Sequence, residues 1–109
     1  MNNCNTEQMI KECYVEYKKG NRKHVPKGMN ATSAKMTVAW LDCLFNGKPV
    51  HFNGSVMQCK LVLEYIKKDD GEELLSKAKS VLKEYCDTAK EKYNKPCNSL
   101  RRLLSYENQ

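Results

Sequence analysis

The sequence predicts an all-α domain, a compact bundle of about five helices stapled by three disulfides. Two observations indicate helices: apolar residues recur at spacings of three and four, and no segment shows the alternation of a strand. The third observation is the cysteine content, because six cysteines in 109 residues are typical of a small secreted protein. The length fits a single domain that spans residues 1–109.

The first predicted helix covers residues 6–19. Thr6 is the expected cap at its start, and Gly20 is the residue that stops it. The apolar residues of this segment share one helical face. They are Met9, Ile10, Cys13, Tyr14 and Tyr17.

The second predicted helix covers residues 33–45 and ends before Gly47. Its apolar residues lie all round the helix, so we expect it to be central and mostly buried. Trp40 lies within this segment and is therefore expected in the core rather than in the wall of a ligand site.

Three further helices are predicted in the second half of the chain. Asn53 is the expected cap of a helix over 54–68. Asp70 is the expected cap of a long amphipathic helix that ends near Tyr93, with acidic residues in its first turn. A short helix follows Pro96.

The cysteine spacing favours disulfides over metal. No two cysteines form the close pair from which structural zinc usually draws its thiolates, so we expect neither a metal nor another cofactor. Six cysteines allow 15 connectivities. Short connections make neighbouring helices antiparallel, which places the third helix's cysteine beside that of the fourth. The expected pairs are Cys13–Cys43, Cys59–Cys86 and Cys4–Cys97.

Other features agree with secretion. Asn30 and Asn53 each begin a sequon for N-linked glycosylation. Met1 precedes polar residues and is expected to replace a removed signal peptide. No apolar run approaches the ~20 residues of a membrane helix, so no membrane span is predicted.

The formal net charge of +6 favours acidic partners. For a secreted chain these are a protein surface, a sulfated glycan or an anionic surface, and nucleic acid is not expected. Positive side chains concentrate in residues 18–27, without an acid, where the alternative interpretation is an ordinary solvated loop. The candidate contact residues are Lys18, Lys19, Arg22, Lys23 and Lys27, with Arg101 and Arg102 as a second patch.

The sequence offers no catalytic constellation. Both histidines, His24 and His51, fall in predicted loops, and no nucleophile motif accompanies them. The chain also has no phosphate-binding or calcium-binding loop. We therefore expect a protein that binds rather than an enzyme.

Part of the cysteine spacing resembles that of insect odorant-binding proteins. The intervals between Cys13, Cys43, Cys86 and Cys97 are similar to first-to-third, third-to-fourth and fourth-to-fifth cysteine spacings of that family. Ala39 stands where the family has a further cysteine. This resemblance implies a carrier of a small apolar ligand.

Size, basic charge, cysteine richness and helicity together resemble small helical salivary proteins of blood-feeding insects. These include anopheline salivary complement inhibitors and basic sand-fly salivary proteins. The resemblance implies a secreted inhibitor that binds a host plasma protein of the complement or contact-activation cascade, with a role in haemostasis and immune evasion. This is the leading hypothesis, and the carrier and a hormone-like or toxin-like ligand are its alternatives.

Overall fold

Five helices make up the part of the chain that the structure describes, and no strand occurs there. The computed structural model describes residues 3–50, 55–95 and 97–107. Its radius of gyration of 13.6 Å is near the roughly 13 Å of a compact domain of this length. The prediction of a compact all-α domain is confirmed. The helices are α1 (Asn3–Lys18), α2 (Ala31–Asn46), α3 (Val56–Asp70), α4 (Glu72–Tyr93) and α5 (Asn98–Glu107).

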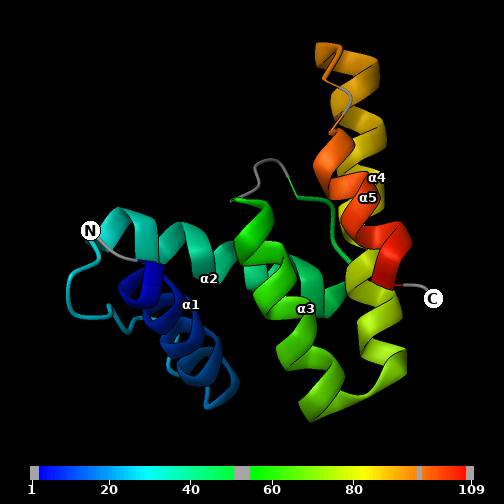
Figure 1. Ribbon diagram of the computed structural model, residues 1–109. Helices are drawn as coiled ribbons and strands as arrows, with labels where there is room; N and C mark the ends of the chain where they lie inside the picture. The colour runs from blue at the N-terminus through cyan, green and yellow to red at the C-terminus, as the bar shows by residue number, and fades with distance from the viewer. Residues whose placement is uncertain (1–2, 51–54, 96, 108–109) are drawn as a thin grey trace.

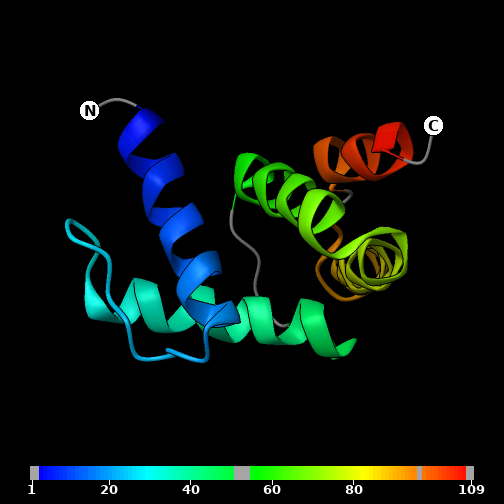
Figure 2. The ribbon, with the colours of Figure 1, turned by 90° about the horizontal axis from the view of Figure 1, so that it is seen from below.

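Helix α3 lies in the middle of the molecule (Figure 1). It packs against α1 on one side and against α4 and α5 on the other. Figure 2 shows α2 running beneath α1 toward α4. Both α1 and α4 contact α2. The C-terminal end of α4 projects beyond the other helices (Figure 1).

The core lies where α2, α3 and α4 meet. Trp40 is fully buried there, as predicted. However, α2 is not mostly buried, because one face packs on α1 and α4 while the other faces solvent. Met36 on that outer face is 45% exposed. Other large side chains with almost no exposed surface are Leu41, Leu44, Leu63, Ile66, Leu75 and Leu82.

Two predicted helix starts differ from those in the structure. Thr6 lies inside α1, which begins at Asn3, and so is not its cap. Ser55 caps α3, and its side chain accepts a hydrogen bond of 3.1 Å from the backbone N–H of Gln58. The expected cap, Asn53, lies outside the described residues.

The prediction that Asp70 is the N-cap of α4 is wrong. Gly71 occupies the N-cap position, and no side chain caps this helix. Asp70 ends α3, and its carboxylate pairs with Lys18 at 2.7 Å. The Tyr14 hydroxyl lies 3.3 Å from the same carboxylate. Asp70 therefore joins α3 to α1 rather than capping α4.

The two predicted helix ends marked by glycine are confirmed. Gly20 follows α1 with a φ of 90°, and Gly47 follows α2 with a φ of 69°. The N–H of Gly47 donates to the carbonyl of Cys43, which satisfies one of the last carbonyls of α2.

The described cysteines line the core. Cys13, Cys59 and Cys86 are buried, and Cys43 and Cys97 are partly buried. No two of these sulfur atoms lie at the distance of a disulfide bond. The side chain of Cys4 lies outside the described part. The structure therefore shows no disulfide among the described cysteines, and the three expected pairs stay predictions.

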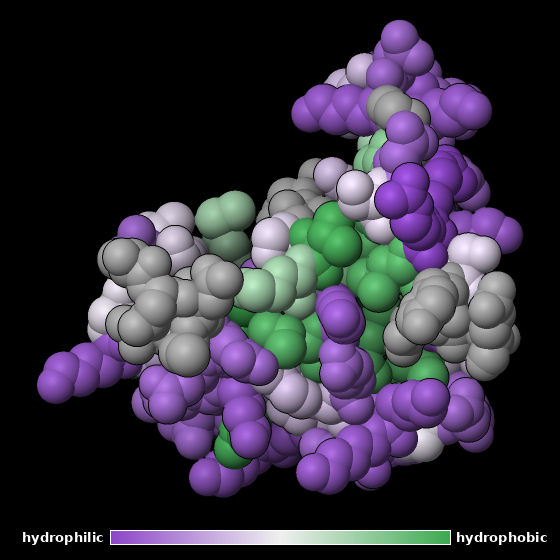
Figure 3. All heavy atoms as spheres, in the orientation of Figure 1, coloured by the Kyte–Doolittle hydropathy of each residue, from purple (hydrophilic) through white to green (hydrophobic). Residues whose placement is uncertain are grey.

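Apolar side chains also reach the surface between α3 and α5, surrounded by hydrophilic ones (Figure 3). Leu61 and Leu103 are among the partly buried residues of these two helices. Within the described ranges, no helix combines the length and apolar character that crossing a membrane requires.

Candidate functional site

The loop between α1 and α2 carries the cationic stretch that the sequence analysis singled out. We call residues 22–27 of this loop the contact segment. Every second side chain of this segment contacts the helices, and those between them are exposed. Arg22 makes its contacts from the surface, because its side chain is 58% exposed. The anchored residues are Arg22, His24 and Pro26, and the exposed ones are Lys23, Val25 and Lys27.

Two of the anchors fix the segment on the body of the protein. Pro26 has almost no exposed surface, so its ring is inserted between other side chains. The imidazole of His24 lies against the carboxylate of Glu12 on α1. This contact is an ion pair when the imidazole is protonated.

Arg22 is anchored by an aromatic ring and a carboxylate. Its guanidinium carbon lies 4.9 Å from the centroid of the Tyr17 ring, within cation–π range. Its Nη1 atom lies 3.2 Å from Oδ1 of Asp42 on α2. The Tyr17 hydroxyl donates to the same oxygen at 2.9 Å. Arg22 therefore helps to hold the loop, while 58% of its side chain remains exposed.

The surroundings of Asp42 favour its charged form. The hydrogen bond from Tyr17 is the main cause that lowers the pKa of Asp42, and the charges of Arg22 and Lys48 add to it. Lys48 lies 3.6 Å from Oδ2. Burial, followed by the hydrogen bond to Asp42, raises the pKa of the Tyr17 hydroxyl, so it remains a donor at neutral pH.

The two lysines that precede the contact segment also have acidic neighbours. Lys18 Nζ lies 2.7 Å from a carboxylate oxygen of Asp70 on α3. Lys19 lies 3.4 Å from Glu16, one turn earlier on α1. The positive stretch is therefore partly compensated by acids that fold onto it, and its free charge lies further along the loop.

Lys23, Val25 and Lys27 form the exposed surface of the contact segment. Val25 is 42% exposed, and in the described part of the chain neither lysine pairs with a carboxylate. Gly20 and Gly28 flank the segment with φ values of 90° and 91°, in the left-handed region that favours glycine. The loop thus presents an apolar side chain between two positive charges.

The second predicted patch is divided by the structure. Arg102 is exposed, whereas Arg101 is partly buried. Nη2 of Arg101 lies 2.9 Å from Oδ1 of Asp87 on α4. Arg101 therefore joins α5 to α4, and the structure does not bring this patch to the contact segment.

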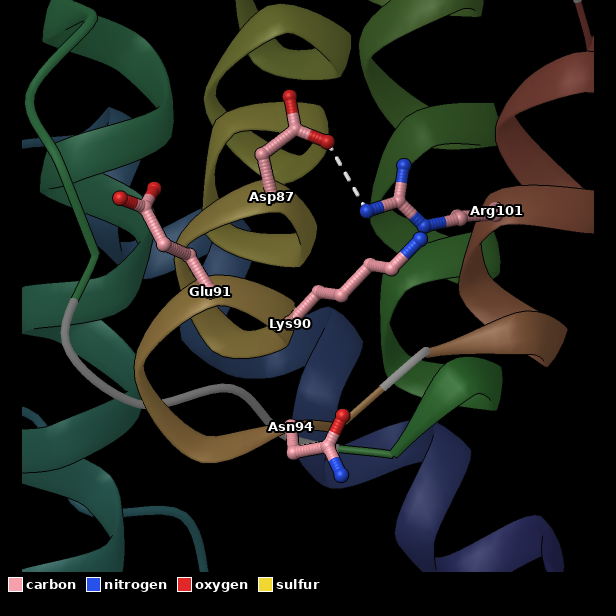
Figure 4. A pocket seen from close by; sticks show the side chains of 5 residues that line it. All are labelled: Asp87, Lys90, Glu91, Asn94 and Arg101. Atoms are coloured by element: carbon pink, nitrogen blue, oxygen red, sulfur yellow. Dashed lines mark ion pairs between the residues drawn. The ribbon is translucent and has the colours of Figure 1, made fainter.

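Arg101 also lines a hollow of about 580 Å³ at the end of α4. Figure 4 shows the Lys90 side chain extending toward Arg101, with Asp87 on the same side. Two acids and two bases share the lining, so the hollow has no strong net charge. Its lining residues are Asp87, Lys90, Glu91, Asn94 and Arg101, and a smaller hollow of about 270 Å³ is lined by Lys83, Arg101, Leu104 and Ser105.

Comparisons with protein-family models, curated proteins and solved structures find no match for this chain. Among the described residues, no group of three or more His, Cys, Asp or Glu side chains could hold a metal ion.

The sequence analysis missed the acids that complete the loop. Glu12, Asp42 and Asp70 lie on three different helices, and no local spacing relates them to residues 18–27. Val25 has a local signal in the sequence, because it is an aliphatic residue between two lysines in a mostly polar loop.

Proposed function

We propose that this protein is a secreted, non-enzymatic binding protein whose contact segment covers an acidic surface on a partner protein. The observation that carries the proposal is the arrangement along residues 22–27, in which Arg22, His24 and Pro26 contact the helices. Lys23, Val25 and Lys27 between them are exposed.

Anchoring supports binding in a specific way. A loop that is already fixed loses little conformational freedom when it binds, so more of the contact energy remains as affinity. Lys23 and Lys27 attract an acidic surface and raise the association rate. Val25 supplies apolar area that loses water in the complex.

The partner belongs to the host plasma in this proposal. The resemblance to salivary complement inhibitors motivates a component of the complement or contact-activation cascade, blocked by occupation of its surface. An extracellular, oxidising compartment belongs to the same proposal, with the cysteines joined as disulfides that staple the helices and with glycans on Asn30 and Asn53.

The test reverses charge at the exposed lysines alone. In the double variant Lys23→Glu/Lys27→Glu, we expect inhibition of plasma complement or contact activation to weaken at least about tenfold, because two attractive contacts become repulsive. Arg22 is left intact because its substitution would release the loop. The readouts are complement haemolysis and clotting time across a concentration series.

A matched control carries the same change of net charge elsewhere. Lys60→Glu/Lys77→Glu alters two exposed lysines on α3 and α4 and is expected to inhibit like the unmodified protein. Circular dichroism confirms that both variants keep their helices. Equal inhibition by the loop variant and the control would remove the contact segment from the function.

The carrier of an apolar ligand is the alternative, and it needs an apolar cavity. The two hollows described above are lined mainly by charged and polar side chains. A fluorescent fatty acid tests this alternative directly. Saturable uptake that an unlabelled apolar ligand displaces at micromolar concentration would favour the carrier over the surface binder.

A further inference from the structure

We propose that Cys86 and Cys97 form a disulfide that joins α4 to the start of α5. This pair replaces the expected Cys59–Cys86 pair, because the sulfur of Cys86 can bond to only one other sulfur. The inference rests on the oxidising compartment of the proposed function. It concerns the end of the molecule that carries the hollow beside Arg101 rather than the contact segment.

The path of the chain allows Cys97 to lie at the same height as Cys86 along the axis of α4. Helix α4 continues for seven residues from Cys86 to Tyr93, which is about 10 Å along its axis. The four steps from Tyr93 to Cys97 reach at most about 14 Å. Asn94 and Cys97 have φ values of 56° and 52°, so the chain reverses sharply there. Cys97 can therefore lie beside Cys86.

An ion pair next to the cysteines sets the register of the two helices. Asp87 follows Cys86, and it pairs with Arg101 at 2.9 Å. Arg101 lies one turn after Cys97, and its N–H donates to the carbonyl of Cys97 at 2.9 Å. Figure 4 shows this pair bridging α4 and α5.

The two cysteines lie in the same part of the core. Cys86 is buried in the core cluster, and Cys97 packs against that cluster. Burial, followed by Cys97, raises the pKa of the Cys86 thiol to about 12. Burial is the main cause that raises the pKa of the Tyr85 hydroxyl, and Cys97, Cys86 and Cys59 add to it. Cys59 lies in the same core cluster as Cys86, so it is the natural competitor.

The bond forms by exchange with a disulfide donor such as oxidised glutathione. The thiolate of Cys97, the more exposed residue, attacks the donor and releases one thiol, which leaves a mixed disulfide on Cys97. The thiolate of Cys86 then attacks the Cys97 sulfur and releases the second thiol. The two protein thiols are oxidised, the donor is reduced, and their two protons appear on the released thiols.

The bridge also has a consequence for the hollow. Asp87, Lys90 and Glu91 lie on α4, while Arg101 lies on α5. A covalent bond between residues 86 and 97 fixes these two walls relative to each other. The hollow then keeps its shape even when salt weakens the Asp87–Arg101 pair.

A tryptic peptide map of the full chain, refolded with oxidised and reduced glutathione, tests the pairing. Trypsin yields peptide 84–90 with Cys86, peptide 93–101 with Cys97, and peptide 36–60 with Cys43 and Cys59. We expect 84–90 linked to 93–101 under non-reducing conditions. A link from 84–90 to 36–60, or an unlinked Cys86, would overturn the proposal.

Two serine variants keep the test informative if linkage is incomplete. In Cys97→Ser, alkylation in denaturant is expected to label Cys86, whereas in Cys59→Ser the link from 84–90 to 93–101 remains. Loss of the link from 84–90 to 93–101 in Cys59→Ser would contradict the pairing. This readout needs no partner, so its failure is distinguishable from a failure of the plasma inhibition assay.

Discussion

Asp42 is the residue at which three parts of the chain meet. Its carboxylate accepts a hydrogen bond from Tyr17 of α1, pairs with Arg22 of the contact segment and lies near Lys48, beyond α2. Loss of its charge therefore affects both the packing of α1 on α2 and the anchoring of the loop.

We predict that Asp42 makes stability depend on acid pH. Because folding lowers the pKa of Asp42, its stabilising effect is fully present above the ordinary value of about 4 and is lost as pH falls through the lower folded value. Urea unfolding from pH 7 to pH 2 should show a smaller acid loss in Asp42→Asn than in the unmodified protein.

A companion variant separates the causes of this shift. The Tyr17 hydrogen bond is the largest of them, so Tyr17→Phe should raise the pKa of Asp42 toward its ordinary value. It should also cost roughly 1 kcal/mol of unfolding free energy, because a partly exposed carboxylate loses one neutral donor. Tyr93→Phe, at an exposed position, is the control. An unchanged Asp42 titration in Tyr17→Phe, followed by NMR, would refute this account.

At the scale of the element, the sequence predicted the helices far better than their caps. The spacing of apolar residues decides which segments become helices, and this signal is local. Asp70 had the local signature of an N-cap, yet Lys18 and Tyr14 of α1 bind its carboxylate. Asx side chains have several partners within reach, and tertiary contacts decide among them.

Asn30 serves as a cap and lies in a sequon, which gives the next prediction. Its side chain accepts a hydrogen bond of 2.7 Å from the N–H of Ser33 at the start of α2. Asn30→Ala should therefore cost about 1 kcal/mol. Asn30→Asp removes the sequon but keeps the acceptor, so in unglycosylated protein it should unfold like the unmodified chain. Equal melting temperatures for Asn30→Ala and Asn30→Asp would show that the cap does not stabilise α2.

At the scale of the whole molecule, the sequence predicted a positive loop but not its division into anchors and exposed residues. Residues 18–27 contain no acid, so the stretch looks uniformly cationic. In the folded chain Glu12 and Asp42 are brought to the loop by the packing of α1 and α2, and Pro26 is inserted between side chains. Which lysines remain exposed is therefore a property of the fold rather than of the loop sequence.

Reduction of the proposed disulfides tests whether they stabilise the whole bundle. Each bridge should contribute roughly 2–4 kcal/mol, while a domain of this kind has a total stability of about 5–15 kcal/mol. Loss of even one bridge should then lower the melting temperature by about 10 °C or more. Thermal unfolding followed by circular dichroism, with and without a phosphine reductant, measures the difference.

The variant Cys86→Ser/Cys97→Ser provides the internal comparison. It lacks one bridge from the start, so its melting temperature should already be low in oxidising buffer and should fall less on reduction than that of the unmodified protein. Because Cys86 belongs to the buried core, the comparison uses the fall in melting temperature on reduction rather than the melting temperature itself. If the unmodified protein melts at one temperature in both buffers, that core alone stabilises the fold, and the cysteines no longer support an extracellular location.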